Sequence, residues 1–315
     1  MQTENVTIIG AGPAGIAAAI QLKRYGIVSL LLEKNETGGL LRNANLVENY
    51  PGFPGGVSGP YLVSLFEKQL VENSLEIVFT ETTELDLKDE LFMVVTSRKV
   101  YYSQVVIVAS GTKPKKFAAL EVPEEIRDKI FYEVYPLLKA KGKRVVVVGA
   151  GDAAFDYALN LSKNNEVVIL NRGKTTRCLP LLRERVKLSP SITYREDTEI
   201  IRMTSVSPAK MLLECNSPRG VSKLDAHHLI FAIGREAQLD FLSERLKSNA
   251  RKMEKRGVLY FVGDVKNNAF RQTAIAVGDG IMAATKIGKC LFTTVTSRNK
   301  GSEGAASKRR GYEPP

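Results

Sequence analysis

Two short glycine-rich stretches carry the clearest chemistry in this sequence: residues 10–15 (GAGPAG) and residues 149–154 (GAGDAA). Each directly follows a short apolar run, residues 6–9 and 145–148, and each precedes a helical pattern. In such a turn the first glycine makes the tight bend, the second lets the backbone approach a pyrophosphate, and the third position lets the helix pack closely on the strand. Because the helix N-terminus then faces the phosphates, both stretches predict dinucleotide binding.

The residues after the next strand differ between the two stretches. The apolar run 27–32 ends at Glu33, an acid that can bind ribose hydroxyls. The run 166–170 is followed instead by Arg172 and, five residues on, by Arg177. Arginine binds phosphate in a bidentate way and an acid would repel it, so the second site predicts a 2′-phosphate; the alternative is that both arginines are ordinary surface charges. One acid and two arginines imply two different dinucleotides, FAD and NADP(H).

Several elements must position these turns. Helical patterns follow both glycine stretches, through Tyr25 and to Leu161, and an amphipathic helix is predicted over residues 61–72. Alternating runs predict short antiparallel strands at residues 77–79, 85–87, 92–95 and 99–101. The continuous apolar run 105–109 predicts a buried strand that ends in a nucleotide-facing turn at Ser110-Gly111. The loops 38–41 and 47–52 are either surface loops or a wall around a cofactor's ring.

Composition places the chain among globular proteins with two domains of ordinary size. The 315 residues are 44% hydrophobic and 25% charged, and no apolar run approaches the ~20 residues of a membrane span. We expect no signal peptide, because a strand pattern begins within a few residues of the N-terminus. The three cysteines, Cys178, Cys215 and Cys290, form no C-x-x-C, which predicts a reducing cytoplasm and no zinc site. His227 and His228 have no matching ligand cluster, so we predict structural roles and no metal.

The net charge of +11 indicates an acidic partner. The segment 298–315 contributes +3, and its composition predicts a flexible basic tail. No aromatic-interleaved basic stripe is present, so nucleic acid is the least favoured partner. The alternative is a solvated surface that happens to be basic.

Taken together, the motifs resemble those of the thioredoxin reductase family, the small flavoprotein branch of the pyridine-nucleotide oxidoreductases. The resemblance covers residues 4–295. The motifs that carry it are 10–15, 38–39, 48–52 (ENYPG), 149–154, 232–235 (AIGR), 262–265 (VGDV) and 270–274 (FRQTA).

The resemblance implies an α/β fold with two Rossmann-like, three-layer dinucleotide-binding domains, the NADP domain being inserted into a split FAD domain. Residues 1–113 and 237–297 would form the FAD domain and residues 114–236 the NADP domain. A homodimer is implied, and often a rotation of the NADP domain about joints near residues 113–116 and 236–239.

The resemblance and the turn chemistry together give two sets of candidate binding residues. The FAD set is Gly10, Gly12, Pro13, Ala14, Gly15, Glu33, Lys34, Gly39, Leu40, Asn49, Ala109, Gly111, Gly263, Asp264, Arg271, Gln272 and Thr273. In the family, Asp264 would bond the ribityl chain, and a helix from Thr273 through Ala284 would point its N-terminus at the flavin pyrimidine edge. The NADP set is Gly149, Gly151, Asp152, Ala153, Arg172, Arg177, Ile233, Gly234 and Arg235.

One feature departs from the family. Its redox C-x-x-C lies 17 and 14 residues before the first glycine of the second turn, and those positions are Tyr132 and Tyr135 here. Without a thiol at either position the dithiol relay is chemically impossible, so we expect no thioredoxin reductase activity. One interpretation of the two tyrosines is a purely structural role, packing at a domain junction. The sharper hypothesis is that one ring covers the flavin face.

Hydride transfer from NADPH to a flavin needs no cysteine. The sequence therefore predicts an FAD-dependent NADPH oxidoreductase whose acceptor is ferredoxin, flavodoxin or a small oxidant, as in the thioredoxin-reductase-like ferredoxin–NADP reductases. Two alternatives stay open: a regulatory subunit that binds flavin or nucleotide without turnover, and a disulfide reductase that uses a partner's cysteines.

Overall fold

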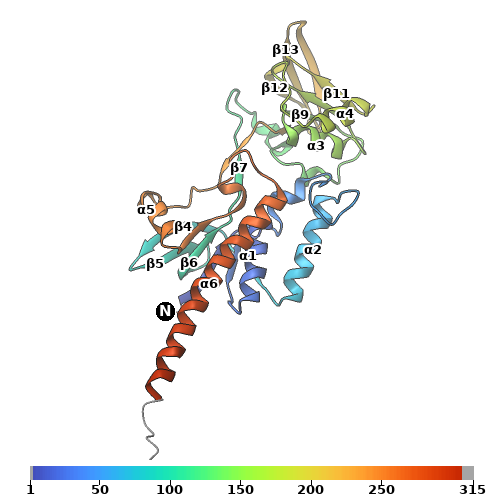
Figure 1. Ribbon diagram of the computed structural model, residues 1–315. Helices are drawn as coiled ribbons and strands as arrows, with labels where there is room; N and C mark the ends of the chain where they lie inside the picture. Colours follow the sequence, from blue (N-terminus) through green and yellow to red (C-terminus); the bar gives the residue numbers. More distant parts are fainter. Residues whose placement is uncertain (1–2, 307–315) are drawn as a thin grey trace, which may run out of the picture. The chain divides into compact units, whose positions relative to one another are not determined.

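The computed structural model describes the backbone of residues 3–306 and the side chains of residues 3–290. The chain forms two units, shown in Figure 1. The first comprises Met1–Gly39, Leu65–Gly111 and Ala237–Pro315, and the second comprises Leu40–Ser64 and Thr112–Glu236. The second unit therefore interrupts the sequence of the first, and each unit has its own sheets and hydrophobic cores.

The first unit is built on a seven-stranded sheet. Its order is β3 (Ile77–Phe79), β2 (Leu30–Glu33), β1 (Thr3–Ile9), β6 (Val100–Val108), β5 (Leu91–Thr96) and β4 (Thr82–Lys88), and β17 (Leu259–Phe261) also pairs with β6. The pairs that involve β1, β2, β3 and β17 are parallel, whereas β4–β5 and β5–β6 are antiparallel. Continuous apolar strands fit the parallel part, because both of its faces are buried.

Two strand predictions in this sheet are wrong. The strand at residues 77–79 pairs with β2 in parallel, not in antiparallel. The predicted strands 99–101 and 105–109 belong to the single strand β6. One edge of β6 pairs with β5 over residues 100–103 and with β17 over residues 106–108. Because the environment of β6 changes midway, its first half alternates and its second half is continuously apolar, and the pattern suggested two strands.

Helices α1 (Pro13–Arg24) and α6 (Thr273–Ala306) pack against each other in the first unit (Figure 1). A Cβ at Gly280 would lie 2.1 Å from the carbonyl oxygen of Ala14, so only glycine permits this approach. The unit also contains α5 (Glu244–Lys255) and the short 3₁₀ helix η4 (Gly263–Val265). The α6 helix begins at Thr273 as predicted but continues to Ala306, so residues 298–306 are helical where a flexible tail was expected. Residues 307–315 lie outside the described residues.

A five-stranded parallel sheet forms the centre of the second unit. Its order is β11 (Ile192–Arg195), β10 (Glu166–Leu170), β9 (Arg144–Val148), β15 (His228–Phe231) and β8 (Ile130–Phe131). Helices α3 (Asp152–Leu161) and α4 (Pro180–Leu188) pack against each other. The α3 helix ends at Leu161 as the pattern predicts, whereas α4 was not predicted.

Two smaller sheets complete the second unit. An antiparallel sheet contains β12 (Glu199–Ser207), β13 (Lys210–Ser217) and β14 (Gly220–Ala226). A two-stranded sheet pairs β7 (Thr112–Pro114) with β16 (Arg235–Ala237), where the chain enters and leaves this unit. The 3₁₀ helices η2 (Glu124–Lys129) and η3 (Tyr135–Leu137) flank β8.

Residues 40–64 belong to the second unit, although the predicted division placed them with residues 1–113. They include most of η1 (Gly39–Asn43) and the start of α2 (Gly59–Glu72), whose predicted range was 61–72. Polar contacts explain the grouping. The Asn45 N–H donates to an Asp156 carboxylate oxygen at 2.8 Å, and Arg185 donates to both Glu48 carboxylate oxygens at 2.6 and 2.9 Å.

Candidate functional site

The first glycine-rich turn has the steric properties of a phosphate cradle. At Gly10, φ is +108° and a Cβ would lie 2.4 Å from the Ala109 carbonyl oxygen. At Gly15 a Cβ would lie 1.9 Å from the Gly10 carbonyl oxygen. A Cβ at Gly12 would meet nothing within 4 Å, so the space in front of the α1 N-terminus is open. The turn therefore fits a pyrophosphate, which first-turn N–H groups such as those of Ala14 and Gly15 can bind.

Glu33 ends β2 beside this turn. Its Oε2 accepts a hydrogen bond from the Ala11 N–H at 2.8 Å, and its Oε1 accepts one from the Asn35 N–H at 3.0 Å. These bonds hold the carboxylate at the turn, where an acid can bind ribose hydroxyls. The neighbouring Lys34 is exposed.

Four further candidate residues surround the first turn. A Cβ at Gly39 would lie 3.5 Å from the Gly12 Cα, and one at Gly263 would lie 2.9 Å from the Ala14 Cβ. Ala109 follows β6, and its N–H donates to the Ile9 carbonyl at 2.8 Å. At Gly111, φ is +65°, and its carbonyl accepts from the Gln238 N–H at 3.0 Å. These loops meet at the carboxyl ends of parallel strands, where such sheets bind ligands.

The segment around η4 reveals a residue that sequence reasoning missed. An Asp279 oxygen accepts hydrogen bonds from the Gly263 N–H at 3.1 Å and from the Asn267 amide at 2.7 Å. The other oxygen lies 3.2 Å from the Lys266 ammonium. Asp279 on α6 therefore holds the turn that contains Asp264. The pattern Gly278-Asp279-Gly280 inside a helix is a signal that could have revealed this role.

The remaining FAD candidates fall in different places. Arg271, Gln272 and Thr273 lead into α6, and the Gln272 carbonyl accepts from the Ala276 N–H at 2.9 Å. Pro13 is the first residue of α1, where its missing N–H costs no hydrogen bond. Leu40 and Asn49 belong to the second unit.

The second glycine-rich turn repeats the geometry of the first. At Gly149, φ is +154° and a Cβ would lie 2.5 Å from the Ala232 carbonyl oxygen. A Cβ at Gly151 would meet nothing within 4 Å, so the space at the α3 N-terminus is open here too. Asp152 and Ala153 form the exposed first turn of α3, and the Asp152 carboxylate accepts from the Leu179 N–H at 2.7 Å. The residues present fit a second pyrophosphate.

The loop after β10 carries the two arginines. Asn171 is buried and organises the loop: its amide donates to the Thr175 carbonyl at 3.1 Å and to the Tyr194 hydroxyl at 2.9 Å. Arg177 pairs through its backbone with the glycine turn, since its N–H donates to the Ala150 carbonyl at 2.7 Å. Arg172 and Arg177 are exposed, and neither side chain has a hydrogen bond or ion pair with the residues that the structure describes. Both guanidinium groups therefore remain available for an anion.

Residues 233–235 follow β15 on the other side of the second turn. Ile233 is exposed, and Gly234 has a φ of +116°. The Arg235 guanidinium is occupied by protein: it donates to the hydroxyl and carbonyl oxygens of Thr112 at 2.9 and 2.8 Å and to Glu133 at 3.1 Å. Arg235 thus anchors β16 to β7.

Tyr132 and Tyr135 occupy well-defined environments in the second unit. The Tyr132 hydroxyl accepts from the Phe117 N–H at 3.2 Å, and its ring lies 5.9 Å from that of Phe231. The Tyr135 hydroxyl accepts from Arg42 at 3.0 Å, and the Tyr135 N–H donates to the Asn43 side chain at 3.0 Å. The Tyr132 ring packs against the core that contains Phe231, whereas Tyr135 is exposed and the Arg42 guanidinium lies over its ring. Packing at a domain junction and coverage of a flavin both stay predictions.

Cys178, Cys215 and Cys290 form no disulfide with one another. Cys215 is buried in the core between the antiparallel sheet and the parallel sheet, Cys178 is partly buried in the core on the other face, and Cys290 is exposed on α6. Burial raises the pKa of the Cys178 and Cys215 thiols, which disfavours the reactive thiolate. Within residues 3–290, no three His, Cys, Asp or Glu side chains are grouped closely enough to hold a metal ion.

A carboxyl group on α3 is strongly perturbed. Burial raises the pKa of Asp156 to about 6, although the hydrogen bond from Asn45 and the charge of Lys163 oppose this rise. Nearby, the hydrogen bonds from Arg185 lower the pKa of the Glu48 carboxyl. The two pKa shifts have opposite signs because Asp156 is largely buried, whereas Glu48 is more exposed and paired with Arg185.

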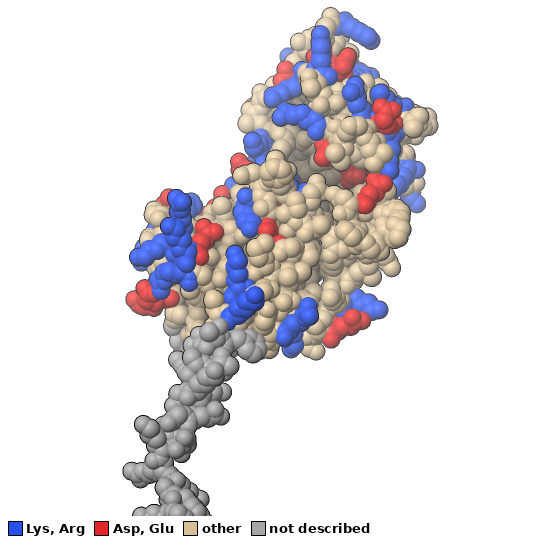
Figure 2. Space-filling model, in the orientation of Figure 1, with Lys and Arg blue, Asp and Glu red and all other residues tan. Residues whose placement is uncertain are grey.

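Basic side chains are prominent on the surface. On the face shown in Figure 2, Lys and Arg gather over α5 and over the three-stranded sheet of β12 to β14. Among the described residues, none of the helices is both long enough and apolar enough to span a bilayer.

The comparisons with known proteins agree with this geometry. The family model of the pyridine nucleotide-disulphide oxidoreductases matches residues 4–280. The thioredoxin reductase of Borreliella burgdorferi is 30% identical over 308 residues, which cover 91% of this chain and 92% of that protein.

Two solved thioredoxin reductases share the fold. The T. acidophilum structure has a TM-score of 0.80 at 26% identity and covers 93% of this chain and 100% of its own. The Lactococcus lactis structure has a TM-score of 0.78 at 25% identity and covers 91% and 98%. These matches confirm the predicted α/β class with two Rossmann-like parts, the flavin oxidoreductase activity and the cofactors FAD and NADP(H). The chain belongs to the pyridine nucleotide-disulphide oxidoreductase family and is similar to its thioredoxin reductases.

Proposed function

We propose that this protein uses NADPH to reduce FAD and passes the electrons to an acceptor without a dithiol relay of its own. The pair Tyr132 and Tyr135 carries the proposal, because these residues lie 17 and 14 positions before Gly149, the spacing at which the resemblance places the family's redox cysteines. Cys178 and Cys215 lie in two different cores of the second unit and so cannot pair with each other without unfolding. No two of the three cysteines, Cys178, Cys215 and Cys290, have the C-x-x-C spacing, so we infer that no dithiol of this chain carries electrons to thioredoxin.

We assign FAD to the first unit and NADP(H) to the second. Gly10, Gly12, Gly15 and Glu33 would hold the FAD pyrophosphate and ribose, with Asp279 fixing the turn at Asp264. When bound, FAD accepts a hydride from NADPH and releases electrons to an acceptor. The α1 N-terminus stabilises negative charge, and the open space at Gly12 leaves room for the phosphates.

We assign the 2′-phosphate of NADP(H) to Arg172 and Arg177. Their guanidinium groups carry no ion pair with described residues, and Arg177 is tied to the glycine turn through its backbone. No acid follows β10 to repel the phosphate, since Asn171 stands there and is used in the loop itself. The arrangement favours NADPH over NADH.

The basic surface supports an acidic electron carrier, such as ferredoxin or flavodoxin, as the acceptor. On α5, Arg251 and Lys255 are exposed one helical turn apart and have no ion-pair partner among the described residues. Their neighbours Arg245 and Arg256 are paired with Asp86 and Glu90. Unpaired cations attract an acidic partner and accelerate its association. We further propose a cytoplasmic homodimer.

A disulfide reductase that borrows a partner's cysteines is the second candidate, favoured by the thioredoxin reductases among its relatives. The test is reduction by NADPH under anaerobic conditions, followed by reoxidation with ferredoxin, flavodoxin, quinone, oxygen, thioredoxin or a disulfide. We expect rapid reoxidation by a carrier or oxidant and none by thioredoxin. In the variant R251E/K255E, reoxidation by an acidic carrier should slow about tenfold at low salt, whereas reduction by NADPH should not change.

Rapid reoxidation by thioredoxin or by a low-molecular-weight disulfide would contradict the first proposal. A flavin that NADPH reduces but that no acceptor reoxidises would indicate the regulatory alternative, a flavin- or nucleotide-binding subunit without turnover. The variant R245E tests the same surface with a residue that is already paired with Asp86 and serves as the comparison for R251E/K255E.

A further inference from the structure

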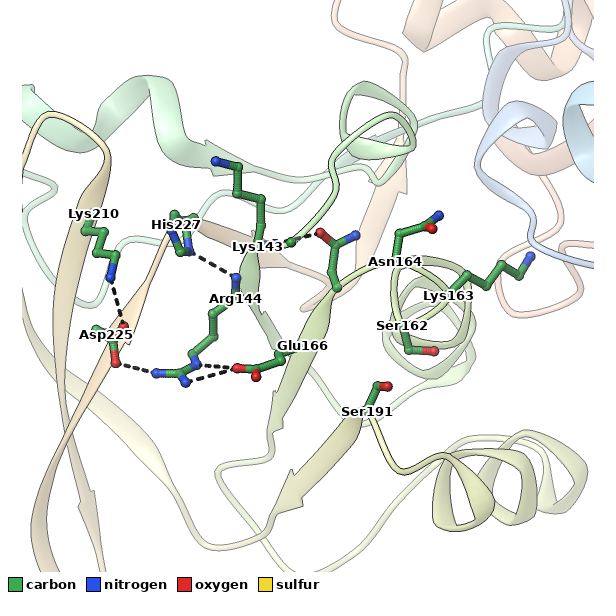
Figure 3. A pocket seen from close by; sticks show the side chains of 12 residues that line it. Lys143, Arg144, Ser162, Lys163, Asn164, Glu166, Ser191, Lys210, Asp225 and His227 are labelled. Atoms are coloured by element: carbon green, nitrogen blue, oxygen red, sulfur yellow. Dashed lines mark hydrogen bonds and ion pairs between the residues drawn. The ribbon is translucent and has the colours of Figure 1, made fainter.

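A polar pocket of about 410 Å³ lies in the second unit, away from the glycine-rich turn (Figure 3). Its lining includes Arg144, Glu166 and His227, which stand at or just before the starts of β9, β10 and β15. The Gly149 turn follows the end of β9. Because these strands are parallel, the pocket lies at their amino ends and the nucleotide turn lies at their carboxyl ends.

Arg144 forms ion pairs with both carboxylates of the pocket. Its Nε and Nη2 atoms each donate to Glu166 Oε2 at 3.0 Å, and its Nη1 atom donates to Asp225. These bonds fix the guanidinium between the two acids, as Figure 3 shows. The carboxylates are therefore occupied by protein, and they do not offer a free anionic site to a cation.

His227 presents a hydrogen-bond donor to the pocket. Its Nδ1 atom accepts a hydrogen bond from the Arg144 N–H at 3.0 Å, and its own backbone N–H donates to the Arg144 carbonyl at 2.9 Å. In the neutral ring this bond places the remaining proton on Nε2. Burial, followed by the charges of Lys143 and Lys210, lowers the pKa of the imidazole, while Asp225 opposes them. The ammonium groups of Lys143 and Lys210 thus lie close enough to His227 to disfavour its protonated form.

The two lysines are poorly satisfied within the protein. The Lys143 ammonium has no hydrogen bond or ion pair with any residue that the structure describes. Within residues 3–290, the Lys210 ammonium has Asp225 as its one ion-pair partner, at 3.9 Å. In Figure 3 the His227 ring lies between the Lys143 and Lys210 side chains. Three donors from three different segments therefore gather in one place without a full set of acceptors.

The charge of the pocket is positive. Lys143, Arg144, Lys163 and Lys210 line it together with Glu166 and Asp225, which leaves a surplus of two positive charges. Of these cations, the Lys163 ammonium donates to the Asn45 side chain at 2.6 Å. A carboxylate ligand would satisfy two donors, whereas a phosphate group has three strong acceptor oxygens. The volume falls within the range of small-molecule sites.

We propose that this pocket binds the phosphate group of a small phosphorylated ligand, with Lys143, Lys210 and the His227 Nε2–H as its donors. The site is separate from the proposed NADP(H) site and does not depend on the proposed function. Its occupant would be a soluble phosphate or pyrophosphate ester.

The chain contains two histidines, so ring-labelled histidine gives a simple NMR spectrum in the full-length, FAD-loaded protein. His228 serves as an internal reference, because its ring packs against Phe131 with centroids 5.6 Å apart and does not line the pocket. Titration with inorganic pyrophosphate at constant ionic strength should shift the His227 signal saturably, with a Kd below about 1 mM. The pKa of His227 should rise, since an anion favours the imidazolium.

Matched variants test the donors. The substitutions K143Q and K210Q should each weaken pyrophosphate binding at least about tenfold. K141Q and K223Q remove the same charge from exposed side chains outside the pocket and should leave binding intact. An unsaturable response, equal binding by K143Q and K141Q, or a His227 shift with anionic lipid vesicles but not with pyrophosphate would each overturn the proposal.

Discussion

The two glycine-rich turns meet the same steric constraint at their first glycine and differ at their third position. A Cβ at Gly10 would lie 2.4 Å from the carbonyl oxygen of Ala109, the residue after β6. A Cβ at Gly149 would lie 2.5 Å from that of Ala232, the residue after β15. At the third position, a Cβ on Gly15 would lie 1.9 Å from a backbone oxygen, whereas Ala154 keeps its methyl group. The turn before α3 therefore has room for a methyl group at the position where the turn before α1 has none. The constraint at the first glycine is part of the turn, and that at the third varies with helix packing.

The turns also differ in the charge that faces them. Glu33 is held at the first turn by two backbone N–H groups, whereas the second turn faces two arginines without partners in the described part of the chain. In the two proposed sites phosphate recognition is shared, and the side chains proposed to bind the ribose end differ. The comparison teaches that cofactor identity resides in a few side chains outside the turn itself.

The largest expected effect comes from adding a methyl group at each first glycine. G10A should abolish FAD binding, because its Cβ cannot be accommodated at φ +108°. G149A should keep FAD but lose reduction by NADPH. Flavin absorbance after purification and the NADPH reduction rate distinguish the two outcomes.

The variant G173A provides the control, since a Cβ there meets nothing within 4 Å and φ is not positive. It should retain both flavin and reduction. Loss of flavin in G149A, with flavin kept in G10A, would exchange the two assignments.

Removing both arginines tests the charge difference. In R172A/R177A the KM for NADPH should rise about 10- to 100-fold, while the KM for NADH changes little, because each guanidinium–phosphate bond is worth about 1.5–3 kcal/mol before losses. Steady-state kinetics with both nucleotides measure this preference. K174A, a neighbour whose ammonium lies 3.8 Å from Asp197, should not change it. Equal losses with NADPH and NADH would show that the arginines do not contact a 2′-phosphate.

A smaller effect separates the two helices that follow the turns. Seven residues after the first glycine, α1 has Ala17 and α3 has Asp156, whose pKa burial raises to about 6. The folded state therefore binds this proton more tightly than the unfolded state, and stability is lost as the pH rises from about 4 to about 6. D156N has no carboxyl at this position and so does not lose this stability. The free energy of unfolding of D156N minus that of the wild type should therefore rise by about 2–3 kcal/mol between pH 4 and pH 7.

Urea unfolding of both proteins across this pH range measures the difference. The pH-dependent part of the difference in the free energy of unfolding should be complete near pH 7 and absent near pH 4. Parallel stability curves for D156N and wild type would show that the carboxyl is ionised as easily in the folded protein as in the unfolded chain.

Local patterns predicted the parts of the fold that depend on short-range rules. The glycine turns, the start of α6 at Thr273 and the end of α3 at Leu161 follow from such rules. Two features were not predicted: β6 is one continuous strand, and β3 pairs in parallel with β2. Both depend on neighbouring strands, and a short sequence pattern does not show which strands will be neighbours. The extension of α6 to Ala306 was also missed, because glycine and serine there suggested a loop.

The candidate site shows the same division. Gly10, Glu33 and Gly149 were found from spacing, and the structure brings each to its turn. Asp279, Asn43 and Arg185 were missed because they act through partners 12 to 137 residues away. Arg235 was predicted to bind NADP(H), but its guanidinium is used by Thr112 and Glu133, a choice that only the paired strands β7 and β16 reveal.

The central claim is that electrons reach the flavin and leave it without a disulfide in this chain. Anaerobic titration of the FAD-loaded protein with NADPH tests it most directly. We predict complete bleaching with about one NADPH per flavin, unchanged after alkylation of the accessible thiols, because a hydride transfer reduces the flavin alone. Consumption of about two NADPH per flavin would reveal a disulfide that accepts a second electron pair and would contradict the account.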